Sequence, residues 1–215
     1  MDNFILEIPN IVPPNLCKEI VKKVKNDPNK SNAPTIAYLI GNEKLIVDEK
    51  LSAVVMKDNK NYDEFIKPMI EIFFDIYDKY LKHLETTFKD INKDADYNMN
   101  PFIREIKSDR DVNIEGGFIV HEITKGRSYK WHHDFVYSDG ERFISIIIYL
   151  NTLEEGEGGH TEFLCGRKVR PEIGKAVAYP VNWDFIHKGN EVLGDNAKYI
   201  CTGQIKTIYH YEYIK

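Results

Sequence analysis

The short segment from Tyr129 to Asp134 holds the residues of this sequence that are best placed to do chemistry. It reads Tyr-Lys-Trp-His-His-Asp, so one residue separates His132 from Asp134. Alternate side chains of an extended strand share a face, which predicts that these two lie together while His133 points the other way. An imidazole nitrogen and a carboxylate oxygen are two of the three ligands in a two-histidine, one-carboxylate site, the type that suits non-haem Fe(II). A His-x-Asp triplet often arises by chance, so it indicates a metal site only if the rest of the chain supplies the third ligand.

His187, which ends the segment Tyr179–His187, is available as that third ligand. Several expected strands separate it from His132, as a jelly roll requires if a late strand is to face an early one. Eleven residues further on, Lys198 begins the apolar run Lys198–Thr202. An unpaired buried ammonium is costly, so a lysine at this position predicts a bound anion.

The composition predicts a soluble globular protein with enough apolar residues for a sizeable core. The chain has 215 residues, of which 42% are hydrophobic and 29% charged, ordinary values for that class. Its formal net charge of -5 argues against a protein that binds nucleic acid through clustered Lys and Arg.

The cysteines and the apolar runs bear on the compartment. Cys17, Cys165 and Cys201 are odd in number and far apart, so they form neither a disulfide framework nor a Cys-x-x-Cys metal motif. The first residues lack the pattern of a secretory signal, and the longest apolar run, Phe143–Leu150, is too short to span a bilayer. We therefore expect a reduced, cytoplasmic protein that does not enter a membrane.

The first half of the chain predicts helices that support a sheet. We expect a short strand at Phe4–Ile8, then a helix capped by Asn15 and ending near Asn26. The strongest amphipathic pattern, from Asp63 to Thr86, predicts a helix whose apolar stripe packs against a sheet. Two short apolar pieces lie between these helices: Thr35–Ile40, and Leu51–Met56, which fits a strand or a helix equally well.

A long polar excursion, Phe88–Gly117, follows, with irregular strands expected around Phe102–Ile106. After it the pattern changes to short strands separated by turn residues, which favours a sandwich or jelly roll over a parallel sheet. The expected strands are Phe118–Ile123, Ser128–Asp134, Phe143–Leu150, His160–Leu164, Ala176–Tyr179 and Lys198–Tyr209.

These motifs, taken in order, resemble the prolyl 4-hydroxylase-like Fe(II)/2-oxoglutarate-dependent oxygenases. The resemblance covers roughly Phe118 to Gln204 and departs from the family pattern at three points. Lys198 follows the distal histidine by one residue more than is common, Gln204 replaces a frequent Trp, and His160 replaces a frequent Glu. The matching residues are Tyr129, His132, Asp134, Arg142, Tyr149-Leu150-Asn151, Gly158 to Phe163, Pro171, Gly174, His187 and Lys198.

The resemblance implies a mainly β fold, a double-stranded β-helix (jelly roll, cupin-like) with N-terminal α-helices packed on the major sheet. Fe(II) would be held by His132, Asp134 and His187. The distal carboxylate of 2-oxoglutarate would be bound by Lys198 and Tyr149, with Tyr129 lining the same pocket. The implied reaction consumes O2, hydroxylates an unactivated C–H bond and converts 2-oxoglutarate to succinate and CO2. Ascorbate is the implied reductant.

On this interpretation residues 1–215 form a single dioxygenase domain, with a support region over 1–117 and the catalytic core over 118–209. The expected substrate is a peptide, a protein or an amino acid, most of all a peptidyl proline. Three residues are candidates for the substrate side: Arg142, which either holds the substrate or closes a surface ion pair, His160, and Trp183. Trp131 and Trp183 fit pocket walls and core packing equally well.

Two other functions are kept as alternatives. Nucleic-acid demethylases share the iron site, but an arginine-rich run typically follows their distal histidine, and the segment from Lys188 to Lys198 has no arginine. A non-catalytic jelly-roll binding module would show no iron-dependent turnover. The substrate, the oligomeric state and the roles of His121 and His133 stay open at this stage.

Overall fold

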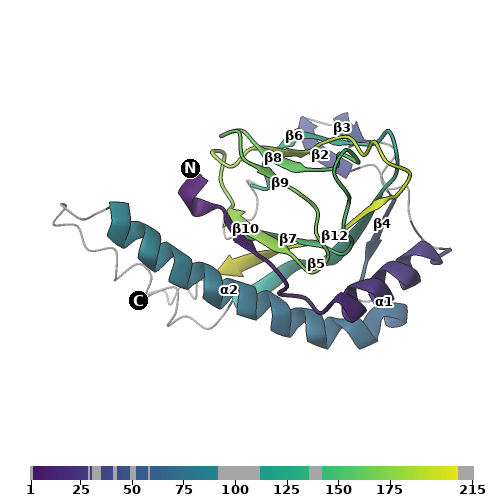
Figure 1. Ribbon diagram of the computed structural model, residues 1–215, viewed down its shortest axis with the longest axis horizontal. Coiled ribbons are helices and arrows are strands. Elements are labelled where there is room, and N and C mark those ends of the chain that lie inside the picture. The colour runs from purple at the N-terminus through teal and green to yellow at the C-terminus, as the bar shows by residue number, and fades with distance from the viewer. Residues whose placement is uncertain are drawn as a thin grey trace.

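Two antiparallel sheets face each other in the computed structural model, which describes residues 2–28, 30, 35–40, 43–48, 52–57, 59–91, 112–135 and 142–207. Six of the described strands form the major sheet, in the order β1-β10-β7-β12-β5-β4, and four form the minor sheet, in the order β6-β11-β8-β9 (Figure 1). This arrangement confirms the predicted double-stranded β-helix. The strands are β1 (Leu6–Ile8), β2 (Thr35–Ile40), β3 (Glu43–Asp48), β4 (Ser52–Val55), β5 (Val112–Ile123), β6 (Tyr129–His132), β7 (Arg142–Tyr149), β8 (Thr161–Phe163), β9 (Lys168–Val169), β10 (Ala176–Pro180), β11 (His187–Gly189) and β12 (Lys198–Thr207).

The two faces of the major sheet differ in chemistry. In β7, Ile144, Ile146 and Ile148 pack into the core beneath the helices, whereas Ile147 and Tyr149 pack into the barrel interior. This period-two alternation buries the strand on both faces. The outward face is almost wholly apolar, and the inward face carries hydroxyl, imidazole and ammonium groups that can form a site.

Two helices cover the outward face of the major sheet (Figure 1). They are α1 (Pro14–Lys25) and α2 (Asp63–Ile91), with short 3-10 turns at Asp2–Phe4 and Lys60–Tyr62. The expected cap at Asn15 is wrong: the helix begins at Pro14, whose fixed φ suits a first helical position, and no side chain caps it. The apolar stripe of α2 packs against the sheet as predicted, through residues such as Phe73, which contacts the ring of Phe118 at a centroid distance of 4.9 Å.

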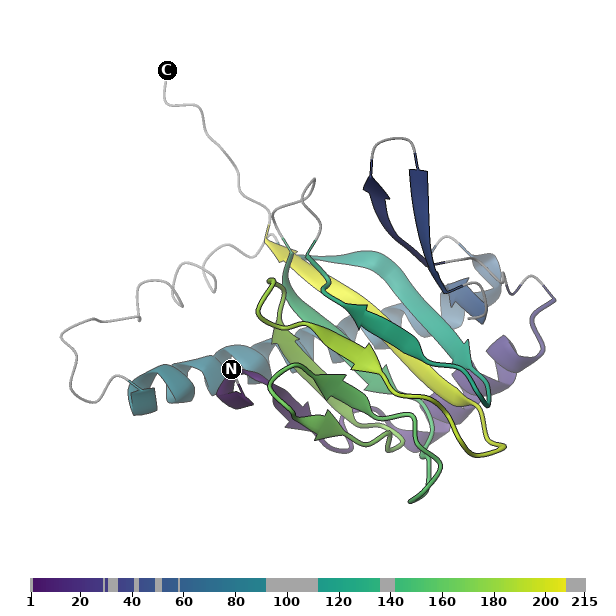
Figure 2. The ribbon, with the colours of Figure 1, turned by 90° about the horizontal axis from the view of Figure 1, so that it is seen from above.

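The minor sheet lies opposite the inward face of the major sheet and closes the barrel (Figure 2). A two-stranded hairpin, β2–β3, projects from the body beside it. The segment left open at Leu51–Met56 contains a strand, β4, which pairs with β5 and forms one edge of the major sheet.

The structure corrects the long excursion predicted at Phe88–Gly117. The helix α2 extends to Ile91 and β5 begins at Val112, so regular structure occupies both ends of that range. The strands expected around Phe102–Ile106 lie outside the described residues. The sequence also missed β11 (His187–Gly189), whose His-Lys-Gly composition carries no strand pattern.

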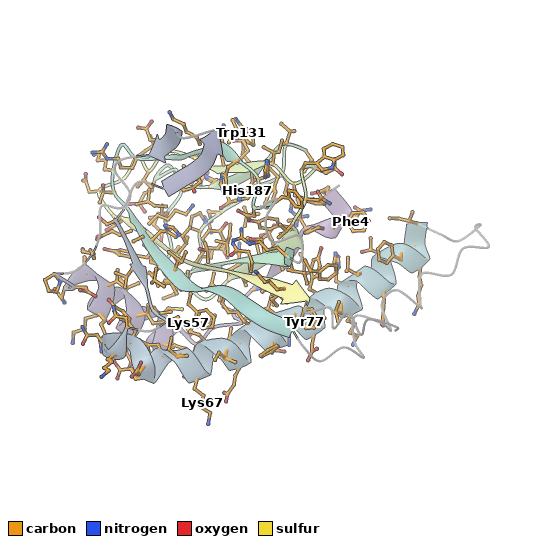
Figure 3. All side chains as sticks on the ribbon, turned by 180° about the vertical axis from the view of Figure 1, so that it is seen from behind. Phe4, Lys57, Lys67, Tyr77, Trp131 and His187 are labelled. Carbon is orange, nitrogen blue, oxygen red and sulfur yellow. The ribbon has the colours of Figure 1, made fainter. Side chains whose placement is uncertain are left out.

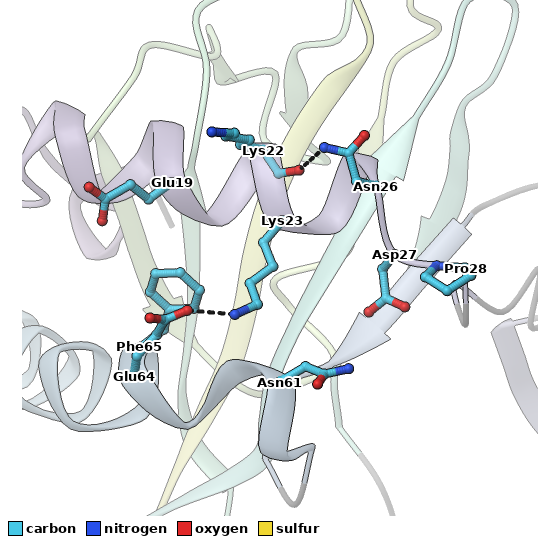
Figure 4. A pocket seen from close by; sticks show the side chains of 9 residues that line it. All are labelled: Glu19, Lys22, Lys23, Asn26, Asp27, Pro28, Asn61, Glu64 and Phe65. Atoms are coloured by element: carbon cyan, nitrogen blue, oxygen red, sulfur yellow. Dashed lines mark hydrogen bonds and ion pairs between the residues drawn. The ribbon is translucent and has the colours of Figure 1, made fainter.

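A surface groove lies between the end of α1 and the start of α2 (Figure 4). Three of its charged side chains have partners, since Lys23 contacts Glu64 at 2.5 Å and the buried Asp27 accepts a hydrogen bond of 2.7 Å from Tyr62. These contacts join the two helices. Within the described part of the chain, no helix is both long enough and apolar enough to cross a membrane.

Candidate active site

His132, Asp134 and His187 meet inside the barrel, with one ligand atom from each within 4.8 Å of the others. His132 ends β6 and pairs directly with His187, the first residue of β11, while Asp134 follows two residues after β6. The Nε2 atom of His132 lies 3.7 Å from Oδ1 of Asp134, and that of His187 lies 3.9 Å from Oδ2. Metal–ligand bonds of about 2 Å allow a single ion to bridge such separations.

Hydrogen bonds to the main chain fix how the two imidazole rings face. Nδ1 of His132 lies 2.8 Å from the carbonyl of Lys130, and Nδ1 of His187 lies 3.0 Å from the carbonyl of Phe185. Because a carbonyl only accepts, Nδ1 carries the proton in each ring, and the lone pair of each Nε2 points to the site. This is the tautomer that a metal ion requires.

The electrostatics keep His132 and Asp134 in their metal-binding protonation states. Burial, together with the charge of His187, lowers the pKa of His132 to about 4, so this ring is neutral at pH 7. Burial raises the pKa of Asp134, but the two histidines and hydrogen bonds from Ser145 and Tyr179 outweigh it and place that pKa below its usual range. A neutral imidazole and an ionised carboxylate are what a divalent cation needs.

Lys198 lies deeper in the same interior and is only 1% exposed. Burial lowers the pKa of its ammonium to about 7. Its Nζ lies 5.6 Å from the ring centroid of Tyr149, and no carboxylate among the described residues forms an ion pair with it. Gly159 makes room beside it, since a Cβ there would lie 2.5 Å from Leu153 Cδ1 and 3.5 Å from Lys198 Cδ. The lysine therefore lies in the barrel interior without a counter-charge from any described residue.

The other two residues predicted for the cosubstrate lie in the same interior. Tyr149 is fully buried, and its hydroxyl donates a hydrogen bond of 2.7 Å to Thr161. The ring of Tyr129 lies 4.3 Å from that of His132, centroid to centroid. The structure thus brings Tyr129 to the metal corner, and Tyr149 to Lys198.

The candidates for the substrate side are more scattered. Arg142 donates a hydrogen bond of 2.9 Å to the main-chain carbonyl of Asp134, so it fixes the backbone of the site. His160 is half-buried on the Lys198 side, where burial and then the charge of Lys198 lower its pKa. Trp183 is 72% exposed and Trp131 is 44% exposed, so core packing is the wrong interpretation for both. Trp131 lies at the outer surface, whereas His187 lies within the barrel (Figure 3).

His121 and His133, whose roles the sequence leaves undecided, lie in different surroundings. His121 lies on the inward face of β5, with its Nε2 3.3 Å from the hydroxyl of Thr202, and the charges of Lys198 and His132 both act on it. His133 lies beside Phe135, with a ring distance of 6.4 Å.

Sequence reasoning missed three hydroxyl groups that line the interior: Ser145, Thr161 and Tyr179. Tyr179 is 1% exposed, and its hydroxyl lies 2.9 Å from Oδ2 of Asp134 and 3.0 Å from Nε2 of His187. A signal was present for Ser145 and Tyr179, because each interrupts an apolar strand at a position that alternation places on the inward face.

Comparisons with known proteins agree with this site. Residues 118–206 match the family model described as the 2OG-Fe(II) oxygenase superfamily, a range that includes the whole triad and Lys198. No curated protein matches the chain by sequence. Residues 118–206 therefore match a 2OG-Fe(II) oxygenase domain, and this match supports a dioxygenase enzyme; that superfamily uses Fe(II), 2-oxoglutarate and O2.

Similar solved structures show the same fold. A prolyl-4-hydroxylase from Pseudomonas putida has a TM-score of 0.59 at 14% identity, covering 96% of this chain and 94% of that chain. The viral collagen prolyl hydroxylase of Paramecium Bursaria Chlorella virus-1, in a 2OG complex, gives 0.54 at 15% identity, with 96% and 97% covered. A prolyl hydroxylase from Trichoplax adhaerens, in complex with a hypoxia inducible factor peptide, gives 0.62 at 15% identity, with 95% and 84% covered.

Proposed function

We propose that His132, Asp134 and His187 hold the Fe(II) of this dioxygenase, and that Lys198 binds the distal carboxylate of 2-oxoglutarate. One observation carries this proposal: a single barrel holds both a converging triad and a buried ammonium to which no described residue supplies an anionic partner. Fe(II), 2-oxoglutarate and O2 would together supply hydroxylation of an unactivated C–H bond, with release of succinate and CO2.

The chain's own residues would bind the ion and 2-oxoglutarate, orient them and keep water out of the pocket. The neutral Nε2 atoms and the carboxylate of Asp134 would occupy one side of the ion and leave its other positions open for ligands. Lys198 would form a charge-assisted hydrogen bond with the cosubstrate, with the Tyr149 hydroxyl as a second donor. Apolar inward side chains such as Ile147, Phe163 and Val177 would keep the pocket dry.

We further propose that the substrate is a peptidyl proline or a similar amino-acid side chain. The support is the likeness of fold to three prolyl hydroxylases, one of them in complex with a peptide. Arg142, His160 and Trp183 remain candidates for the substrate side, and ascorbate for the reductant.

The domain boundaries and the compartment are also proposals. Residues 1–117 would support a catalytic core over 118–209 within a single domain. Consistent with this, β1 pairs with β10 and β4 pairs with β5, so strands from the first part complete both edges of the major sheet. A cytoplasmic location fits three cysteines that are all free thiols.

Anaerobic incubation with Fe(II), 2-oxoglutarate and a panel of proline-containing peptides, followed by addition of O2, tests the proposal. We expect a peptide that gains one oxygen atom, with one succinate formed for each. Succinate without any oxidised peptide across a broad panel would contradict proline as the target. No iron-dependent turnover, and a melting temperature unchanged by Mn(II) plus 2-oxoglutarate, would contradict the oxygenase itself and favour a binding module.

A further inference from the structure

Tyr179 brings a phenol to the metal corner from the floor of the barrel. It lies on β10 after Ala176, Val177 and Ala178, a run with no other polar side chain. Its hydroxyl is within hydrogen-bond distance of one ligand atom of Asp134 and one of His187, at 2.9 and 3.0 Å. A buried hydroxyl aimed at two of the three converging groups calls for a role of its own.

The hydrogen-bond inventory decides which contact can persist once a metal ion is bound. A phenol has a single proton to donate, while Oδ2 of Asp134 and the lone pair of His187 Nε2 are both acceptors. Nε2 is an acceptor because Nδ1 of the same ring donates to the carbonyl of Phe185. An ion that takes the Nε2 lone pair leaves Asp134 as the acceptor.

A second hydroxyl reinforces this contact. Ser145 on β7 pairs directly with Tyr179 across the sheet, and its hydroxyl is a further hydrogen-bond partner for Asp134. Asp134 itself lies beyond the end of β6, so no strand pairing holds its side chain in place. Ser145 and Tyr179 of the major sheet therefore hold the side chain of Asp134, which strand pairing does not hold.

We propose that Tyr179 is a positioning residue that engages Oδ2 of Asp134 and so presents the other oxygen, Oδ1, to the metal ion as a single ligand. The inference rests on the proposed metal centre. A carboxylate with one oxygen held by a hydrogen bond leaves more of the ion's positions open than a carboxylate that binds through both oxygens.

The test is the substitution Tyr179→Phe, which removes only the hydroxyl, measured by Mn(II) binding to the full chain under anaerobic conditions without cosubstrate. Partners of metal ligands are typically worth about 10–100-fold in metal affinity, so we expect the Kd for Mn(II) to rise by that factor. We also expect the visible absorption of the Co(II)-loaded chain to change, because the carboxylate binds differently.

Tyr80→Phe is the matched control. Tyr80 is equally buried, and its hydroxyl donates a hydrogen bond of 2.9 Å to the carbonyl of Phe4, away from the triad. Its removal should leave the Kd for Mn(II) and the Co(II) spectrum unchanged. An equal loss of affinity in both variants would overturn the role of Tyr179, as would an unchanged Kd and spectrum in Tyr179→Phe. Failure of the unmodified chain to bind Mn(II) would overturn the metal centre as well.

Discussion

The two ends of the barrel interior satisfy their polar groups in opposite ways. At the metal corner, both imidazoles bond to main-chain carbonyls, and the carboxylate of Asp134 is held by Ser145 and Tyr179. At the other end, Lys198 is a buried cation for which no described residue supplies a counter-charge, and burial alone lowers its pKa. The first end is complete within the protein, and the second is completed only by a ligand.

The two ends therefore govern different properties: the metal corner governs the coordination geometry of the ion, and Lys198 governs the affinity for the cosubstrate. Ligand atoms that are oriented before the ion arrives need little rearrangement to bind it, which favours one coordination geometry. A buried ammonium without a partner destabilises the free protein, and an entering carboxylate relieves that cost. Changes at the metal corner should therefore alter metal binding, and changes at Lys198 should alter cosubstrate binding alone.

The largest expected effect comes from removing a ligand at the metal corner. Asp134→Ala deletes the carboxylate and leaves the two buried imidazoles without their anionic neighbour. Loss of a hydrogen-bond partner of a ligand typically costs about 10–100-fold in metal affinity, so loss of the ligand itself should cost more than about 100-fold. Titration with Mn(II) measures the affinity, and succinate formation should fall below detection.

His133→Ala is the control for this prediction, because it removes the neighbouring imidazole, whose ring lies 6.4 Å from that of Phe135, and keeps all three ligands. It should retain metal binding and turnover. Turnover retained by Asp134→Ala would remove this carboxylate from the centre.

The next largest effect is expected at the other end of the interior. Lys198→Met removes the ammonium but keeps a long apolar side chain, so the cavity stays filled. A hydrogen bond to a charged group contributes about 1.5–3 kcal/mol, so the Kd for 2-oxoglutarate should rise at least about ten-fold. Binding of Mn(II) alone should not change. Calorimetry with each ligand measures both.

The matched control is Lys188→Met. Lys188 is a half-exposed lysine whose Nζ lies 4.7 Å from the ring centroid of Trp131 and 3.4 Å from Glu162, outside the interior. This variant should bind both ligands normally. If Lys198→Met loses Mn(II) as well, the two ends are not independent and the comparison fails.

The closeness of His132 and Asp134 could be predicted because side-chain identity and strand alternation are local properties, whereas His187 was a distant candidate that the resemblance to the oxygenase family supported. The apolar stripe of α2 and the burial of Lys198 could be predicted from the sequence for the same reason. Each needs only the residue types and a period of 2 or 3.6.

What could not be predicted depends on register between distant strands. Ser145 and Tyr179 reach Asp134 because β7 and β10 pair with these two residues opposite each other, and nothing local in either strand specifies that register. The exposure of Trp131 and Trp183 likewise depends on which elements cover them. The strand β11 is specified by its neighbours β6 and β8 rather than by its own sequence.

A pH dependence should distinguish the two ends further. The pKa of Lys198 is about 7 in the free protein, below its usual value of 10.5, and a bound carboxylate would raise it. Above pH 7 the lysine must take up a proton when 2-oxoglutarate binds, so affinity should fall as pH rises, by up to about ten-fold per unit. Without cosubstrate, the free energy of unfolding should rise with pH over the same range, because the unfolded state then binds more protons than the folded state.

Calorimetry in buffers of different ionisation enthalpy measures the proton taken up. Lys198→Arg should bind without this uptake, since arginine stays charged at every accessible pH. An affinity for 2-oxoglutarate that is flat from pH 7 to 9 would show that Lys198 is already charged in the free pocket.

The smallest effect is expected from Tyr149→Phe, which tests whether the lysine end has a second donor. In the free protein the Tyr149 hydroxyl donates to Thr161 at 2.7 Å, so it must turn from a satisfied bond to reach a carboxylate. A neutral hydrogen bond contributes about 0.5–1.5 kcal/mol net, so the Kd for 2-oxoglutarate should rise about 2–10-fold. Combining this substitution with Thr161→Val completes a double-mutant cycle. Strong coupling between the two would mean that Tyr149 acts through Thr161, whereas additive losses would mean that both hydroxyls bind the cosubstrate directly.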